Sequence, residues 1–315
     1  MHQLLRLNYR DPQERDRSKC HVSYSQFAMY MKCPKQWELS YIKRESAYEP
    51  SIHTVFGTAM HEVFQEYIRL MYEDSVKAAN QLGVEQFLKQ RMAAVYKEEL
   101  EKYGQHISTK KELNEFYSDG VEILNWFLKR RGGYFNSKNF ELLGIEVPIL
   151  HQASETNEHV QMLGYLDLVL RDKRDGQIII YDIKTSTNGW NKYQKADKLK
   201  QAQLVLYKKY FAEQYGLNVD NIKIVFFIVK RKLIEGAMFP QKRIVEYTPP
   251  SGKPSRNKFQ KQMDSFIESS FLPDGSYNTD KTYLAIAGKA SKNCKYCPFK
   301  EQLDLCPKEN RIKDA

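Results

Sequence analysis

Hydrophobic residues in the first 135 positions recur at the three- and four-residue spacing of amphipathic helices. Phe27, Met31 and Leu39 share one such helical face. The pattern predicts four helices, which begin near residue 25 and cover residues 57–72, 75–103 and 110–131. Gly132-Gly133 ends the last of them. Residues 1–22 are polar, and we expect them to form a flexible N-terminal segment.

The pattern changes after residue 135 to the alternation and the short continuous apolar runs of β-strands. Five strands are predicted, over residues 141–150, 162–170, 177–184, 222–230 and 243–247. Asp175-Gly176 is a favoured hairpin turn and joins the second strand to the third. A helix over residues 197–215 precedes the fourth strand, and a loop over residues 249–256 precedes a last helix over residues 257–270.

This order of elements predicts a single α/β core with a mixed sheet, wrapped by helical additions. We expect a helical region over residues 23–135, the α/β core over residues 136–250 and a C-terminal helix with a cysteine-bearing tail over residues 251–315. Residues 23–306 would act as one domain. A Gly-rich turn after the first strand and a phosphate-binding loop are both missing from the sequence, which disfavours a dinucleotide fold and a motor ATPase.

The composition is that of a soluble globular protein with a basic surface. The 315 residues are 42% hydrophobic and 28% charged, and the net charge of +10 favours a polyanionic partner. The longest aliphatic and aromatic run, residues 224–229, is far shorter than the ~20 residues that span a membrane. The N-terminal apolar stretch is too short for a secretory signal. Five cysteines are too few for a disulfide scaffold, so we expect a reducing cytoplasm, bacterial, archaeal or phage-infected, where clustered cysteines bind metal.

The segment IIIYDIKTS, residues 178–186, places two opposite charges at the end of an apolar strand. Asp182 and Lys184 point to the same face because they are two residues apart. If the hairpin forms, Asp167 on the preceding strand lies near Asp182. Two adjacent carboxylates repel each other unless a proton or a cation intervenes. The pair therefore suits Mg²⁺ or Mn²⁺, with Lys184 beside it to orient the nucleophile and stabilise negative charge.

Each of these features also has a simpler interpretation. Asp182 and Lys184 can form a plain salt bridge. A lone histidine such as His61 is more often a packing or surface residue than a metal ligand. The segment 191–210 has six lysines and one acidic residue, which is typical of a solvated helix face as well as of a surface that follows a phosphate backbone.

Four motifs in order nevertheless resemble those of the PD-(D/E)XK nuclease superfamily, and within it those of the RecB-like exonuclease branch. They are Gly57-x-x-x-His61, Gly164-x-x-Asp167, Asp182-Ile183-Lys184-Thr185 and Gln203-x-x-x-Tyr207. The resemblance covers about residues 23–306. It implies a restriction-endonuclease-like fold, in which helices flank a mixed β-sheet, with an N-terminal helical insertion and a C-terminal cysteine-bearing tail.

The resemblance also implies a role for each motif residue. The metal ligands would be His61, Asp167, Asp182 and the carbonyl of Ile183. Lys184 would be the catalytic lysine. Gln203 and Tyr207 would line the helix that contacts DNA at the site.

The cysteines form a second candidate site. Cys294-x-x-Cys297 and Cys306 lie in the tail, and the context of Cys33 resembles the first cysteine of AddB-type and CRISPR-adaptation nucleases. In those families one cysteine before the core and three after it hold a [4Fe–4S] cluster, although eight residues between Cys297 and Cys306 is longer than the commonest spacing. A structural Zn²⁺ site and unligated cysteines are the alternatives. We expect Cys20 to be a free thiol.

Together these features predict a metal-dependent DNA exonuclease that acts on single-stranded DNA or DNA ends. The lysine-rich helix, with Trp190 and Tyr193, would guide a single strand to the metal. Because the sequence has no phosphate loop, a helicase or another recombination or CRISPR partner would supply any unwinding. DNA repair, recombination, phage DNA processing and CRISPR adaptation all fit. The alternatives are a flap or structure-specific endonuclease with the same site and a non-catalytic DNA-binding module.

Overall fold

The computed structural model describes residues 18–45 and 50–313, which form a mixed α/β fold around one central sheet. The six strands of the sheet are β1 (Cys20–Val22), β2 (Phe140–Ser154), β3 (Asn157–Asp172), β4 (Ile178–Ser186), β5 (Ile222–Lys230) and β6 (Ile244–Tyr247). Their order is β1-β3-β4-β5-β6, and β2 also pairs with β3. The pairs β1–β3 and β4–β5 are parallel, whereas β2–β3, β3–β4 and β5–β6 are antiparallel.

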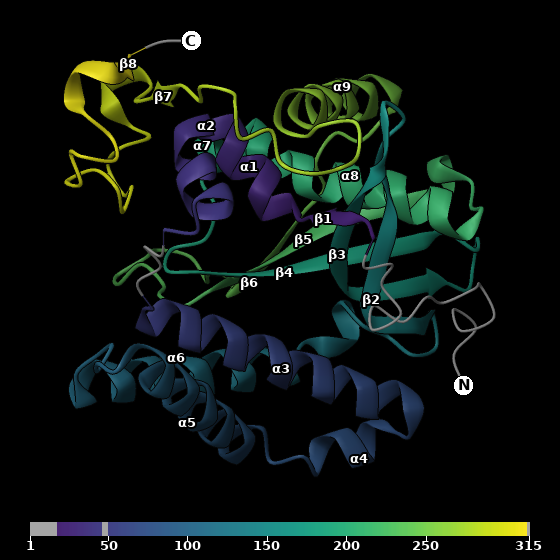
Figure 1. Cartoon of the computed structure of the whole chain (residues 1–315). Coiled ribbons are helices and arrows are strands. Elements are labelled where there is room, and N and C mark those ends of the chain that lie inside the picture. The colour runs from purple at the N-terminus through teal and green to yellow at the C-terminus, as the bar shows by residue number, and fades with distance from the viewer. Residues whose placement is uncertain (1–17, 46–49, 314–315) are drawn as a thin grey trace.

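Helices cover both faces of this sheet (Figure 1). One face carries α3 (Ile52–Glu73), α4 (Val76–Asn80), α5 (Val84–Tyr103) and α6 (Lys110–Leu128). The other carries α1 (Tyr24–Lys32), α2 (Pro34–Trp37), the π-helix η3 (Glu38–Ile42), α8 (Lys198–Tyr215) and α9 (Lys253–Ser270). The short helix α7 (Lys192–Ala196) precedes α8. The architecture is consistent with the restriction-endonuclease-like fold that the sequence predicted.

Strand β5 shows why the sheet is buried on both sides. Phe226 packs in the hydrophobic core with α8 and α9, whereas its neighbour Phe227 packs in the core with α3 and α6. Successive strand residues point to opposite faces, so a continuous apolar run fills both cores. The central strands that end at the candidate site are therefore rigidly held.

The smaller elements join or follow these layers. They are the 3₁₀-helices η4 (Arg131–Gly133), η5 (Val219–Asn221), η6 (Lys289–Ser291) and η7 (Lys308–Asn310), and the paired strands β7 (Ala285–Ile286) and β8 (Arg311–Ile312). The C-terminal tail, yellow in Figure 1, lies beside α1 and α2. In the described part of the chain, every helix falls short of the length and apolarity that a membrane crossing requires.

Several boundaries differ from the predictions. The helix expected to begin at Gly57 begins at Ile52, because the Ser51 side chain caps it. The stretch 75–103 forms two helices, separated at Gly83, which adopts a left-handed φ of 63°. Residues 253–256, predicted as loop, start α9, because Pro254 is favourable in a first helical turn.

Two elements of the central sheet and its flanking helices were not predicted, and neither were the two-residue strands β7 and β8 of the tail. Residues Cys20–Val22, assigned to the flexible N-terminal segment, form β1 against β3, and Lys192–Ala196 form α7. The rest of that predicted flexible segment, residues 1–17, lies outside the described residues. Both elements are shorter than the windows over which hydrophobic periodicity is informative.

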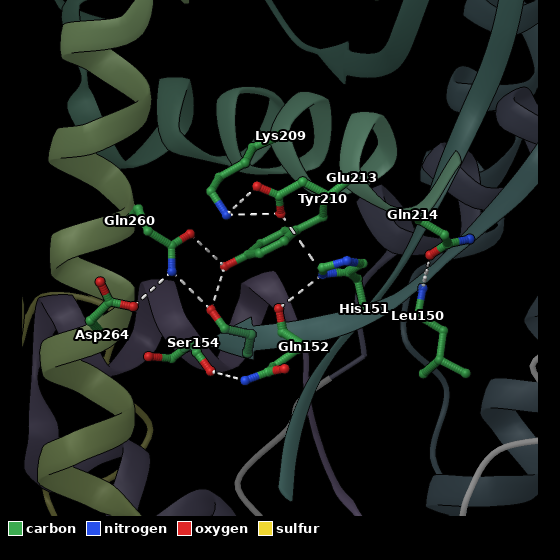
Figure 2. A network of polar contacts seen from close by, with 11 residues as sticks. Leu150, His151, Gln152, Ser154, Lys209, Tyr210, Glu213, Gln214, Gln260 and Asp264 are labelled. Carbon is green, nitrogen blue, oxygen red and sulfur yellow. Dashed lines mark hydrogen bonds and ion pairs between the residues drawn. The ribbon is translucent and has the colours of Figure 1, made fainter. Parts of the chain in front are cut away.

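A polar network anchors the β2–β3 hairpin to the helices above it (Figure 2). The buried Tyr210 hydroxyl on α8 donates to the carbonyl of Ala153 at 2.7 Å and to Gln260 Oε1 at 3.1 Å. Gln260 on α9 donates in turn to Ala153 and to Asp264 Oδ1. Because β2, α8 and α9 share these bonds, the network fixes where α8, which carries Gln203 and Tyr207, lies on the sheet.

Candidate active site

Three neighbouring strands bring acidic residues to one level of the sheet. The β3–β4 ladder pairs Leu168 with Tyr181, which sets Asp167 beside Asp182 as the predicted hairpin requires. On the other side of β3, the antiparallel ladder with β2 brings Glu146 level with Asp167. The carboxylate of Asp167 is thus flanked by an acidic residue on each neighbouring strand.

His61 reaches this group from α3. Its Nε2 lies 3.4 Å from Asp167 Oδ2 and 2.5 Å from the carbonyl oxygen of Ile183. Ligand atoms of His61, Glu146 and Asp167 all lie within 4.8 Å of one another. Carboxylate and carbonyl oxygens with one imidazole nitrogen are donors that suit Mg²⁺ or Mn²⁺. The residues present therefore fit a divalent cation.

The electrostatics of Asp167 also fit a cation. Burial, and then the negative charge of Asp182, raise the pKa of Asp167 from 3.8 to about 7. The Ile183 N–H donates to Asp167 Oδ2 at 2.6 Å, and this bond with the nearby charges of His61 and Lys184 offsets only part of the shift. A bound cation would remove the remaining repulsion.

Lys184 lies on the open side of the cluster. Its Nζ is 3.0 Å from Asp182 Oδ1 and 2.8 Å from Oδ2. Burial lowers the pKa of Lys184, but the charges of Asp182 and Asp167 outweigh it, so the pKa is raised and the ammonium stays protonated. The salt bridge considered as a simpler interpretation is therefore present, and it forms one side of the acidic cluster.

Gln203 and Tyr207 approach from the opposite layer, on α8. Tyr207 is buried against β3, where a Cβ on Gly164 would lie 2.9 Å from the tyrosine ring, so this close approach requires glycine. Burial, and then the charge of Asp182, raise the pKa of Tyr207, and Gln203 forms a hydrogen bond with it. Tyr207 is therefore held as a neutral hydroxyl next to the carboxylates.

The sequence analysis missed two residues of this site, Glu146 and Gln65. Gln65 Nε2 lies 2.5 Å from Glu146 Oε1 and donates to the carbonyl of Asp167 at 3.3 Å. Glu146 has a φ of 51°, which is uncommon for a residue with a side chain. Both left a signal: Glu146 interrupts the apolar run of its strand, and Gln65 lies one helical turn after His61.

The cluster opens into a pocket of about 530 Å³ between α3 and the end of β4. Residues of the predicted motifs line it together with the two that were missed. They are Thr54, Gly57, Thr58, His61, Glu62, Gln65, Glu146, Ile183, Lys184 and Thr185. His61, Glu146 and Ile183 therefore face the pocket, whereas Asp167 and the buried Asp182 lie behind them.

The residues predicted to guide a single DNA strand lie partly in the core and partly on the surface. Trp190 packs on Phe226 with ring centroids 4.8 Å apart, and Lys200 Nζ lies 4.8 Å from its ring, so this tryptophan is mostly structural. Lys208 is buried, and burial lowers its pKa. Tyr193 is 72% exposed and stays available to a ligand.

All four predicted cysteines line one pocket between the start of α2 and the C-terminal tail. Cys33 begins α2 and accepts a hydrogen bond from Ile286 N at 3.3 Å, and Cys294, Cys297 and Cys306 come from the tail. The side chain of Asn293 donates to the carbonyl of Lys32 at 2.8 Å, which also ties the tail to α1. Within the described residues, these four cysteines form no disulfide, and neither does Cys20, which forms a hydrogen bond with Tyr277 outside this pocket.

The spacing of these sulfurs bears on what they can hold. Among the described residues, the cysteines contain no trio of sulfurs within 4.8 Å of one another. Four thiolates on one zinc ion at 2.3 Å would lie about 3.8 Å apart. Burial, with the neighbouring thiols, raises the pKa of Cys297, so a bound metal is needed to stabilise thiolates here. The pocket therefore brings together four sulfur donors, the ligand type of both zinc and iron–sulfur centres.

Comparison with known proteins identifies the family of the chain. A family model described as the PD-(D/E)XK nuclease superfamily matches residues 21–306 of the chain. The matched span includes the acidic cluster and the four cysteines of the pocket. A search of curated proteins finds no match.

Proposed function

The chain belongs to the PD-(D/E)XK nuclease superfamily, and we propose that it is a metal-dependent DNA exonuclease of the RecB-like type. The observation that carries this proposal is the contact of His61 with Asp167 and of the protonated Lys184 with Asp182, where His61, Glu146 and Lys184 line one open pocket. A purely structural ion pair would not need an acidic residue on each of three neighbouring strands and a histidine beside them.

Each residue of the cluster then has a role in hydrolysis. Asp167, Asp182, His61 and the carbonyl of Ile183 would hold Mg²⁺ or Mn²⁺, and Glu146 would complete the set. Such an ion supplies Lewis acidity and offsets the charge of the phosphodiester. Lys184, fixed by Asp182, is free on its other side to donate to a phosphate oxygen and stabilise the charge that develops there.

The overall reaction adds water across one phosphorus–oxygen bond. The water oxygen bonds to phosphorus, the bond to the leaving sugar oxygen breaks, and that oxygen gains a proton. Tyr207, held neutral beside the carboxylates, and Gln203 would orient the strand from the α8 side. We propose single-stranded DNA or DNA ends as substrate because the exposed Tyr193 and the lysines of residues 191–210 precede and form α8.

We further propose that Cys33, Cys294, Cys297 and Cys306 hold a structural [4Fe–4S] cluster. Each thiolate of such a cluster binds a different iron, and the four cysteines that line this pocket supply one thiolate for each of the four irons. The cluster would staple α1 and α2 to the C-terminal tail. Iron analysis and the visible spectrum of anaerobically purified protein test this, and stoichiometric zinc in place of iron would refute it.

The proposed setting is DNA processing in a reducing cytoplasm, in recombination, repair, phage DNA processing or CRISPR adaptation. The sequence has no phosphate loop, so a helicase or another partner protein would separate the strands. A free DNA end would serve equally well.

The nuclease assay uses DNA labelled at one end, with Mg²⁺ or Mn²⁺, and compares wild type with Lys184→Ala. Lys97→Ala is the matched control, because Lys97 is an exposed lysine on α5. Metal-dependent shortening that Lys184→Ala loses and Lys97→Ala keeps is expected. Closed circular DNA run in parallel should stay intact. Cutting of the circle would indicate an endonuclease, and folded, metal-loaded wild type that binds DNA without cutting it would contradict the proposal.

A further inference from the structure

A second pocket, of about 250 Å³, adjoins the candidate active site and has the opposite chemical character. The two pockets share Thr54 and Thr185 as lining residues. The second pocket is lined by His53, Thr54, Phe56, Thr185, Ser186, Thr187 and Arg231. None of these described residues is acidic, whereas Glu62 and Glu146 line the active-site pocket.

Hydrogen-bond donors reach this pocket from two elements. Thr185 at the end of β4 and Thr187 just after it provide hydroxyl groups, whereas the Ser186 hydroxyl between them already donates to the carbonyl of Gly189 at 3.2 Å. The first turn of α3 provides the side chains of His53 and Thr54 at the positive end of the helix dipole, although the Thr54 N–H itself is bonded to Ser51. Donors without carboxylates select an anion and disfavour a cation.

Arg231 provides the most specific observation. It is only 9% exposed, and its guanidinium lies 4.0 Å from the ring centroid of Phe116. One terminal nitrogen donates to Asp119 at 2.6 Å and to Glu115 at 3.1 Å on α6. Its Nε, in contrast, is buried and has no hydrogen-bond partner in the described structure. A buried N–H without an acceptor is unfavourable, and because Arg231 lines this pocket, a ligand oxygen that reached Nε would satisfy it.

The charge around Arg231 is nearly balanced. Lys232 also contacts Asp119 and Glu115, so two basic and two acidic side chains offset one another. The backbone N–H groups of Arg231 and Lys232 bond to the carbonyls of Ser186 and Thr187, which fixes Arg231 beside the end of β4. Recognition in this pocket therefore depends on oriented donors more than on net charge.

We propose that this donor pocket binds a phosphate group of the substrate strand, next to the phosphate at the candidate active site. The inference rests on the proposed function and adds a prediction of how the DNA strand is positioned along the active site. An anion fixed in the donor pocket determines which linkage of the strand reaches Lys184. The bound group is either an internal phosphodiester or a terminal phosphate, and both have the oxygen acceptors that the donors require.

The test measures binding without cleavage. Fluorescence anisotropy in EDTA follows a labelled single-stranded oligonucleotide with wild type, Thr187→Val and Arg231→Lys. Thr187→Val keeps the side-chain shape and removes one donor, and Arg231→Lys keeps the charge and removes Nε. Each should weaken binding about three- to tenfold. Thr279→Val, which removes an exposed hydroxyl outside both pockets, should bind as wild type does.

Chemically modified strands then identify the phosphate. Neutral methylphosphonate linkages are moved one position at a time along the oligonucleotide, and its 5′ and 3′ ends carry either phosphate or hydroxyl. At one position, the neutral linkage should weaken binding by wild type about as much as the Thr187→Val substitution does. The same linkage should weaken binding by Thr187→Val only slightly further, which is the coupling that identifies the phosphate. A coupling at an internal linkage identifies a phosphodiester, and a coupling at one end identifies a terminal phosphate.

Two results separate this inference from the proposed function. Equal binding by wild type, Thr187→Val and Arg231→Lys, with circular dichroism showing all three folded, would overturn the phosphate pocket while cleavage by wild type still stands. If the neutral linkage and Thr187→Val weaken binding non-additively in EDTA but the protein never cleaves DNA, the pocket is supported and the nuclease proposal is overturned.

Discussion

The acidic cluster and the cysteine pocket are two candidate metal sites built in opposite ways. The first takes oxygen donors from adjacent strands of one sheet, with His61 from the helix that packs on it. The second takes sulfur donors from α2 and from a tail whose regular structure is limited to short 3₁₀ turns and two-residue strands.

This difference predicts how each site depends on its metal. The sheet holds the acidic cluster together through backbone ladders, so repulsion between Asp167 and Asp182 remains when the metal is removed. The cysteine tail has few such contacts, so a metal centre there would be part of its folding. The first site would be preformed and the second formed by its cofactor.

The largest expected effect comes from Asp167→Asn. Cleavage should fall about 10³-fold or more, because the central ligand is lost. The metal-free protein should nevertheless become more stable at pH 8, because the neutral amide removes the repulsion from Asp182. Cleavage activity and melting temperature, measured on the same preparation, check whether the variant loses activity while it gains stability.

The pH dependence provides the control for that variant. The pKa of Asp167 is raised from 3.8 to about 7, so folded, metal-free wild type binds an extra proton and loses stability as the pH rises between these values. The stability gain of Asp167→Asn should therefore vanish near pH 4. A gain that is the same at pH 4 and pH 8 would contradict the repulsion argument.

At the cysteine pocket, loss of a ligand should destabilise the protein instead of stabilising it. Cys297→Ala should lose iron and destabilise the protein by about 2–5 kcal/mol, the range seen when a native cross-link is removed. Limited proteolysis should then cut the tail first and leave the sheet intact. Full iron content with unchanged melting would rule out a structural cluster, and Cys20→Ala, which alters a cysteine outside the pocket, is the matched control.

Added Mn²⁺ should distinguish the two sites without a mutation in either. At 100 times its dissociation constant, an ion that binds only the folded protein stabilises it by about 2.7 kcal/mol. Thermal melting should show this gain in wild type and in Lys97→Ala, and Asp182→Asn should lack it. An equal gain in Asp182→Asn would mean that Mn²⁺ binds elsewhere.

The smallest predicted effect is at Gln65, which contacts Glu146 and the backbone of Asp167 but is not itself a proposed ligand. Gln65→Leu should weaken the apparent Mn²⁺ affinity about 10-fold, with the maximal rate at saturating metal nearly unchanged. Metal titrations of cleavage check this split. A loss that saturating Mn²⁺ does not restore would mean that Gln65 acts on the substrate instead.

The sequence predicted the parts of the site that local patterns determine. The Asp175-Gly176 turn fixes the hairpin register, so the meeting of Asp167 and Asp182 followed from the sequence. His61 entered only through its motif, because helical periodicity does not say which residue of α3 faces the sheet edge.

The direction of the Glu146 side chain and the donor pocket beside the active site could not be predicted in the same way. The β2–β3 ladder contains a register shift between Leu142 and Gly144, and Glu146 has a positive φ, so simple alternation does not give its direction. The donor pocket joins the start of α3, the end of β4 and Arg231, which only tertiary packing brings together.

The most direct test of this account is single-turnover cleavage of end-labelled, single-stranded DNA by iron-loaded protein as Mn²⁺ is added. Wild type should cleave with saturable Mn²⁺ dependence, and Asp182→Asn, with the same iron content and fold, should cleave about 10³-fold more slowly or not at all. Cleavage by Asp182→Asn at the wild-type rate would show that the acidic cluster is not where the reaction occurs.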